Sequence, residues 1–207
     1  ASMAIDAVIE GDAMIAMMAA MAGDFARSSS MFEAGSGYWK FAFDLLADLA
    51  PELSGSVLRQ APPFFARTLM FPYSEGMVFL LDIGERQGYG AVDDVYRNPP
   101  ESTEQVLHPE KYIAGEAPIA IDEPTWNTSL RRLGSNVLGE VQIRYILNDE
   151  SAAAGWGGDR YTLFDDDGKN VLVWMSTWDS PKDADEFSNA WRRYIGTRLQ
   201  RNRNQDA

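Results

Sequence analysis

Hydrophobic positions recur at two different periods along the chain, and the change of period separates a helical part from a mixed part. From Ala4 to Ala22 almost every residue is Ala, Met, Ile or Val. Four methionines in this stretch recur at positions i, i+3, i+4 and i+7, which predicts an apolar helix. Helical spacing also predicts helices over 38–49, 91–97 and 138–147. A further helix is predicted from an N-cap at Ser74 to Gln87, and a helical turn is predicted from Ser102 until Pro109 ends it.

The period changes to two after a glycine-rich loop at 155–158. Alternating segments at 160–164 and 171–177 flank Asp165-Asp-Asp-Gly168, which predicts a β-hairpin. The preceding segment, 113–128, contains prolines and shows no regular period, apart from a short strand that we expect at 119–121.

A last amphipathic helix is predicted over 181–199, with Asp179 or Ser180 as its cap. Its inward positions are predicted to be Ala184, Phe187, Trp191 and Ile195. The pattern therefore predicts an α+β fold, mostly helical, with a C-terminal β-hairpin and a final helix. We expect one domain over 1–207, with a helical part at 1–112 and a mixed part at 113–207 that contains the hairpin at 160–177.

The composition is that of an acidic globular protein. Hydrophobic residues make up 45% of the chain, which is enough for a core. The 18 basic and 31 acidic residues give a net charge of -13, which argues against a nucleic-acid partner. No stretch reaches the about 18–20 apolar residues of a membrane span. Five arginines gather near the C-terminus, and we interpret them as a solvated helix face rather than a functional basic arm: Arg192, Arg193, Arg198, Arg201 and Arg203.

Carboxylates interrupt the apolar helices at two places. Glu10 and Asp12 stand within the Ala/Met-rich stretch, and Glu75 precedes a glycine in a second apolar stretch. A buried carboxylate must be paired, hydrogen-bonded, metal-bound or protonated, because burying it alone is costly. Either Glu10 and Asp12 lie on an exposed polar edge or pair with arginine, or Glu10 and Glu75 face each other as a catalytic carboxylate pair.

His108 is the only histidine, and the chain has no cysteine. This chain alone therefore cannot build a zinc site from several His or Cys ligands, and it has no thiol nucleophile or disulfide. His108 either binds a neighbouring carboxylate as part of the local structure or takes part in catalysis. The sequence Gly155-Trp-Gly-Gly-Asp-Arg-Tyr161 either approaches a ligand through its glycines or forms a tight loop with an Asp159–Arg160 pair.

The order of these motifs resembles a group of bacterial HExxH zinc-metallopeptidase-like proteins of the gluzincin type. The resemblance covers nearly the whole chain and implies a metallopeptidase-like helical core. By this resemblance Glu10 is the third zinc ligand, and His108 or Tyr112 stands near the scissile carbonyl as a transition-state stabiliser. The motifs that carry it are Ile9-Glu-Gly-Asp-Ala13, Phe71-Pro-Tyr-Ser-Glu-Gly76, Ser102-Thr-Glu-Gln-Val-Leu-His-Pro-Glu-Lys-Tyr112, Gly155–Tyr161 and Trp178–Phe187.

The sequence departs from the family pattern because it contains no HExxH helix, which in the family precedes the Glu-Gly-x-Ala element. HExxH places two imidazoles one turn apart on zinc, and its glutamate activates the bound water. Zinc is therefore expected only when an upstream segment supplies the motif, and we do not expect the chain to be catalytic alone. An incomplete domain is also expected because the apolar helix at 4–22 needs a cover, which the missing segment or another protein would provide.

Three hypotheses follow. The first is the C-terminal part of a secreted or envelope zinc peptidase, a hydrolase only together with its upstream segment. The second is a peptidase-derived scaffold without metal that binds a partner or serves structurally. The third is a carboxylate-based hydrolase that uses Glu10 and Glu75. The absence of cysteine leans toward a bacterial extracytoplasmic or cell-envelope location, although many cytosolic proteins also lack it.

Overall fold

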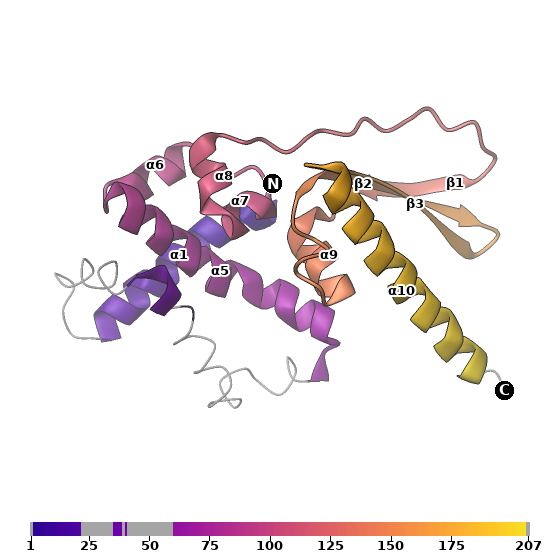
Figure 1. Cartoon of the computed structure of the whole chain (residues 1–207), viewed down its shortest axis with the longest axis horizontal. Helices are drawn as coiled ribbons and strands as arrows, with labels where there is room; N and C mark the ends of the chain where they lie inside the picture. The colour runs from indigo at the N-terminus through magenta and orange to yellow at the C-terminus, as the bar shows by residue number, and fades with distance from the viewer. Residues whose placement is uncertain (1, 22–34, 39, 41–59, 206–207) are drawn as a thin grey trace. The chain divides into compact units, whose positions relative to one another are not determined.

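The computed structural model describes residues 2–21, 35–38, 40 and 60–205, and the predicted helix at 38–49 lies mostly outside them. The chain divides into two compact units, Ala1–Ala117 and Pro118–Ala207. The predicted α+β class is confirmed, since the described chain is mostly helical and contains a three-stranded antiparallel sheet and a final helix (Figure 1). No helix within the described ranges is long and apolar enough to cross a membrane.

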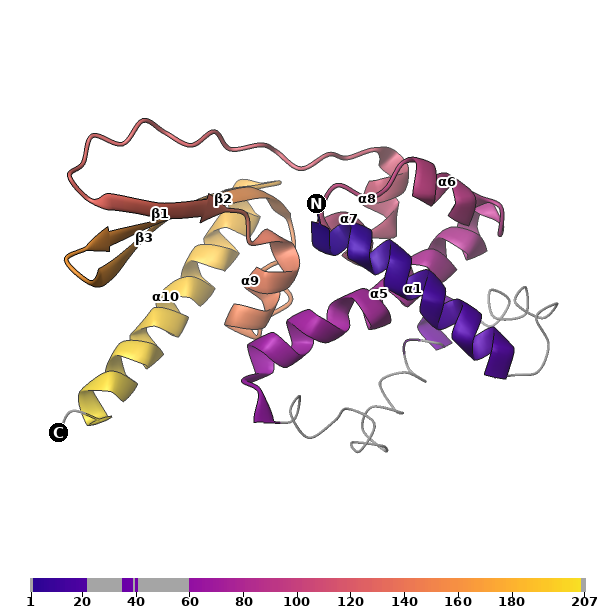
Figure 2. The ribbon, with the colours of Figure 1, turned by 180° about the vertical axis from the view of Figure 1, so that it is seen from behind.

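The first unit is helical. Two long helices, α1 and α5, cross each other in both views, and three short helices follow them (Figures 1 and 2). The described helices are α1 (Ser2–Met21), α5 (Pro63–Gln87), α6 (Ala91–Arg97), α7 (Thr103–Leu107) and α8 (Pro109–Ala114).

The crossing of α1 and α5 is a contact between two backbones. A Cβ atom on Gly76 would overlap the carbonyl oxygen of Ala7, and one on Gly11 would overlap the backbone of Gly76. The face of α1 turned to α5 therefore consists of small residues around Gly11, and Ala7 and Val8 are buried there. Of the methionines at helical spacing, Met14 and Met18 are half-buried and Met17 is 48% exposed, because this close approach favours the small-residue face.

Helix α5 begins eleven residues before the predicted cap at Ser74, with Pro63 in its first turn. Pro72 lies inside the helix and removes one backbone hydrogen bond. The hydroxyl of Ser74 does not cap a helix but donates to the carbonyl of Met70, at 3.2 Å. Pro109 was predicted to end a helical turn. Helix α7 does end before it, at Leu107, but Pro109 is also the first residue of α8, with His108 between the two helices.

The second unit contains the sheet, with strand order β1-β2-β3, and two helices. The predicted hairpin is present: Asp166 pairs with Lys169 across a two-residue Asp167-Gly168 turn, in which both residues have positive φ. The elements are β1 (Arg131–Asn136), α9 (Gly139–Leu147), β2 (Trp156–Asp166), β3 (Lys169–Trp178) and α10 (Pro181–Gln205). Strand β1 was not predicted, because its sequence, Arg-Arg-Leu-Gly-Ser-Asn, lacks an alternating apolar pattern.

Helix α10 packs on one face of the hairpin through aromatic rings. Trp178 stacks on Phe187 at 4.5 Å between ring centroids, and Trp174 meets Phe187 and Trp191 edge to face. Ser180 provides the predicted cap, since its Oγ accepts from the N–H of Asp183. The inward prediction fails for Ile195, which is 37% exposed.

An extended segment at 118–126 lies along β2. The side chains of Arg160, Thr162 and Phe164 alternate along β2 and contact Ile121, Glu123 and Trp126 in that order. The strand expected at 119–121 is absent, although the N–H of Ile119 donates to the carbonyl of Gly157 at 2.7 Å.

Glu123 attaches this segment to β1 and β2 through a carboxyl group with a low pKa. Arg132 donates to both of its oxygens at 2.7 Å, and the indole of Trp126 and the hydroxyl of Thr162 donate as well. The hydrogen bonds from Arg132, above all, lower the pKa of Glu123 from 4.5 to about 2.

We expect the Glu123 carboxyl to titrate near pH 2 and to return toward 4.5 when Arg132 is replaced by glutamine. Because the folded-state pKa is depressed, the contribution to stability is fully present above the unfolded value and is lost as the pH falls through about 2. Carboxyl chemical shifts followed by NMR measure both midpoints. An unchanged midpoint in Arg132→Gln would show that the ion pair does not set this pKa, and Arg131→Gln is the control.

Candidate functional site

A groove of about 560 Å³ lies between α1 and the first half of α5 in the first unit. Its walls are mostly apolar, but two carboxylates, Asp6 and Glu10, stand one helical turn apart on α1. Within the described part of the chain, neither carboxylate has a hydrogen bond or an ion pair. The residues that line the groove are Met3, Asp6, Glu10, Phe65, Thr68, Leu69, Pro72 and Tyr73.

The wall of this groove also contains a buried hydroxyl group and two exposed apolar side chains. Thr68 Oγ1 is buried and has no hydrogen-bond partner among the described residues. Phe65 and Leu69 on α5 are about 60% exposed, at 62% and 60%. Sequence reasoning had identified Glu10 but not Asp6 or Thr68, although the spacing of four residues between Asp6 and Glu10 already placed both carboxylates on one helix face.

The other two carboxylates of the apolar helices are engaged elsewhere. Glu75 binds Lys40 at 2.7 Å and does not line the groove with Glu10. Asp12 accepts a hydrogen bond of 2.8 Å from the hydroxyl of Tyr96. Partial burial, together with the bond to Asp12 and its negative charge, raises the pKa of Tyr96 to about 12. Asp12 thus has a hydrogen-bond partner, but it is a tyrosine rather than an arginine.

The motif around His108 builds its own local structure. Ser102 caps α7 by accepting from the N–H of Gln105, and the side chain of Gln105 accepts from the N–H of Glu101 at 2.7 Å. The same side chain donates to the carbonyl of Glu116, also at 2.7 Å. These polar residues therefore fix the start of α7 and the exit of the chain after α8.

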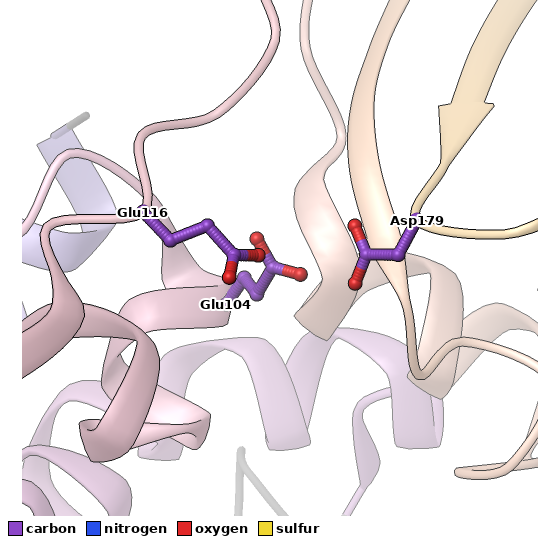
Figure 3. A group of neighbouring side chains, drawn as sticks. All are labelled: Glu104, Glu116 and Asp179. Atoms are coloured by element: carbon purple, nitrogen blue, oxygen red, sulfur yellow. The ribbon is translucent and has the colours of Figure 1, made fainter.

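Two carboxylates of this region are held together by one ammonium group. Glu104, 2% exposed, and Glu116 bind Lys111 Nζ at 2.7 and 2.8 Å. Figure 3 shows the carboxylates of Glu104 and Glu116 directed toward each other. Lys111 lies between them and compensates part of their negative charge within the first unit. Asp179, also labelled in Figure 3, belongs to the second unit, where its N–H donates to the carbonyl of Gly155.

His108 and Tyr112, the predicted transition-state stabilisers, do not line the groove that contains Glu10. The imidazole of His108 is 30% exposed, and its Nδ1 lies 3.7 Å from a carboxylate oxygen of Glu110. The hydroxyl of Tyr112 donates to the carbonyl of Asn98 at 2.8 Å, and its ring meets Phe79 edge to face. Burial is the main cause that raises the pKa of Tyr112.

The glycine-rich motif of the second unit contains a buried carboxylate with four donors. Asp159, 2% exposed, accepts from the N–H groups of Leu138 and Gly139 at the start of α9. It also accepts from the indole N–H groups of Trp156 and Trp174, at 3.0 and 2.9 Å. The expected Asp159–Arg160 pair is wrong, because the four N–H donors already saturate the carboxylate.

Arg160 instead points to the opposite face of the sheet and donates to the carbonyl of Ile121. Gly158 allows that segment to come close, since a Cβ atom there would overlap the carbonyl oxygen of Ile119. The glycine-rich motif thus serves the packing of its own unit in the described structure.

In a comparison with protein families, residues 127–207 match the model of a domain of unknown function (DUF8575). The match covers less than half of the chain and falls within the second unit. No curated protein and no solved structure matches the chain.

Proposed function

We propose that this chain is the C-terminal part of a zinc-metallopeptidase-like protein, in which the first unit presents Glu10 as one metal ligand to an upstream HExxH segment. The observation that carries the proposal is the position of Glu10. Its carboxylate lies in the groove between α1 and α5 and has no bond to another described residue. The motif resemblance assigns the same residue to the metal.

The donor set of this chain fits one ligand of a zinc site, not a whole site. A carboxylate oxygen is an ordinary zinc ligand, but catalytic zinc takes three protein ligands. The single histidine does not line the groove, so the remaining ligands must come from outside this sequence. Zinc, when bound, would act as a Lewis acid and activate water. The exposed apolar wall formed by Phe65 and Leu69 offers packing surface for the helix that brings those ligands.

The motif resemblance assigns the role of transition-state stabiliser to His108 or Tyr112. The hydroxyl proton of Tyr112 is donated to Asn98, so stabilising an oxyanion would require that hydrogen bond to break.

The test uses the protein encoded by the complete reading frame and the pair Glu10→Gln and Glu75→Gln. Each glutamate precedes a glycine at the α1–α5 crossing, so the two variants are matched in context. We expect Glu10→Gln to lower zinc affinity by about 100-fold or more, because a neutral amide replaces an anionic ligand. Zinc content by mass spectrometry and affinity by chelator competition measure this, and Glu75→Gln should retain zinc.

A second function is favoured by the contacts of the motifs. Ser102, Gln105 and Asp159 all serve local structure, as expected of a non-catalytic binding or structural protein on a peptidase-derived scaffold. A complete reading frame without HExxH, or a protein that binds no zinc, would establish this alternative and exclude the first. Equal zinc loss in Glu10→Gln and Glu75→Gln would also count against Glu10 as a ligand.

A further inference from the structure

The charges of α10 are segregated along its length. Its first turns contain Asp183, Asp185 and Glu186, whereas the stretch from Phe187 to Gln205 contains five arginines and no acidic residue. Subtracting these five from the 18 basic residues leaves 13 against 31 acidic ones in the rest of the chain. The second half of α10 is therefore a concentrated basic segment on an otherwise strongly acidic protein.

Apolar side chains are exposed beside these arginines. Arg192, Ile195 and Leu199 are spaced three and four residues apart, so they share one face of the helix. Ile195 is 37% and Leu199 57% exposed. In both views the C-terminal part of α10 diverges from the β2–β3 hairpin (Figures 1 and 2).

Three arginines of this segment, Arg192, Arg193 and Arg198, have described side chains, and they have few acidic partners among the described residues. Arg198 lies over the ring of Tyr194, at 5.1 Å from its centroid, and Arg192 donates to the amide oxygen of Asn189. Across the described ranges, Arg193 alone of these three has a carboxylate neighbour, Asp149, at 3.7 Å. An anionic partner would therefore meet guanidinium groups that are not already neutralised.

We propose that the second half of α10 binds an anionic lipid surface. A helix that carries arginines beside exposed aliphatic residues and an amphipathic aromatic ring fits the boundary between headgroups and acyl chains. Ile195 and Leu199 would enter the apolar layer, while the arginines reach the headgroup phosphates and carboxylates. Tyr194, which is half-buried, has a ring type that is enriched at this boundary.

Other partners fit this face less well. In a second copy, pairing the exposed stripes around Ile195 and Leu199 would set arginines against arginines. A nucleic acid would neutralise the arginines but would leave the two aliphatic side chains exposed to water. The acidic remainder of the chain does not prevent lipid binding at physiological salt, because charges are screened beyond about 8 Å.

The test is cosedimentation of the full chain with vesicles of phosphatidylcholine, with and without phosphatidylserine. We expect binding only when phosphatidylserine is present. The double variant Arg192→Gln/Arg198→Gln should bind about 25-fold more weakly, since each arginine near an anionic membrane contributes a factor of about five. Leu199→Ser should weaken binding at high salt as well as at low salt, because its contribution does not depend on charge.

The matched control is Arg97→Gln/Arg131→Gln, which removes two exposed arginines elsewhere and should bind like the wild type. Circular dichroism confirms that each variant folds. No binding to phosphatidylserine vesicles, or equal loss in both double variants, would overturn the proposal. So would tighter binding to a DNA duplex that is lost in the Arg192/Arg198 variant. The assay contains no zinc, so its result is independent of the proposed function.

Discussion

Replacing Gly76 by alanine is expected to separate α1 from α5 and to destabilise the first unit by at least about 3 kcal/mol. The added methyl carbon would overlap the carbonyl oxygen of Ala7, and backbone atoms cannot move aside as a flexible side chain can. Gly11→Ala should have a similar effect, because its Cβ would meet the backbone of Gly76. Urea denaturation followed by circular dichroism measures the loss, and hydrogen exchange in α1 locates it.

Gly196→Ala is the matched control, since Gly196 also lies inside a helix but nothing surrounds its Cβ position within 4 Å. Alanine there should stabilise α10 by up to about 1 kcal/mol, the usual gain over glycine in a helix. An unchanged denaturation midpoint in Gly76→Ala would contradict the backbone contact at the crossing.

Replacing Asp159 by alanine is expected to destabilise the second unit by about 3–5 kcal/mol. The change leaves two backbone N–H groups at the start of α9 and two indole N–H groups without their acceptor. Because Trp156 and Trp174 belong to this set, the near-ultraviolet circular dichroism of the tryptophans should weaken along with the urea midpoint.

Asp159→Asn should have an intermediate effect, since the amide keeps one accepting oxygen but its NH₂ group faces further donors. Asp166→Asn, at an exposed position near the hairpin turn, is the control and should change stability by less than about 0.5 kcal/mol. If Asp159→Ala unfolds at the same urea concentration as the control, the four donors find other acceptors and the assigned role is wrong.

The parts of the fold that the sequence predicted are those with a strong local signal. The Asp167-Gly168 turn and its alternating flanks identify the hairpin, and Ser180 marks the start of α10. Local signals failed where a distant contact decides the outcome. An N-cap was predicted at Ser74, yet α5 begins at Pro63 and continues through Pro72, because the residues that follow are buried against the rest of the unit.

The candidate site was predictable to a lesser extent. Glu10 was identified because a carboxylate in an apolar helix requires a structural or functional reason. The resemblance to metallopeptidase-like proteins implies one, a role as zinc ligand. Three of the four donors to Asp159 lie 15 to 21 residues away from it. The bridge from Lys111 to Glu104 and Glu116 joins α8 to α7 and to the segment after α8, so no spacing rule within one element connects these residues. Pairings of this kind depend on tertiary packing rather than on local pattern.

Because of the backbone contact at Gly11, the two sides of α1 have different roles. One side attaches the helix to its unit through main-chain proximity, so it tolerates almost no change in residue size. The opposite side, with Ile5, Ile9 and Met17 at 39%, 52% and 48% exposure, contributes little to that attachment. Residues on the outer side of α1 can therefore change during evolution to suit a binding partner without weakening the packing of α1 on α5. A mutational scan of the two sides would separate the residues needed for folding from those needed for binding.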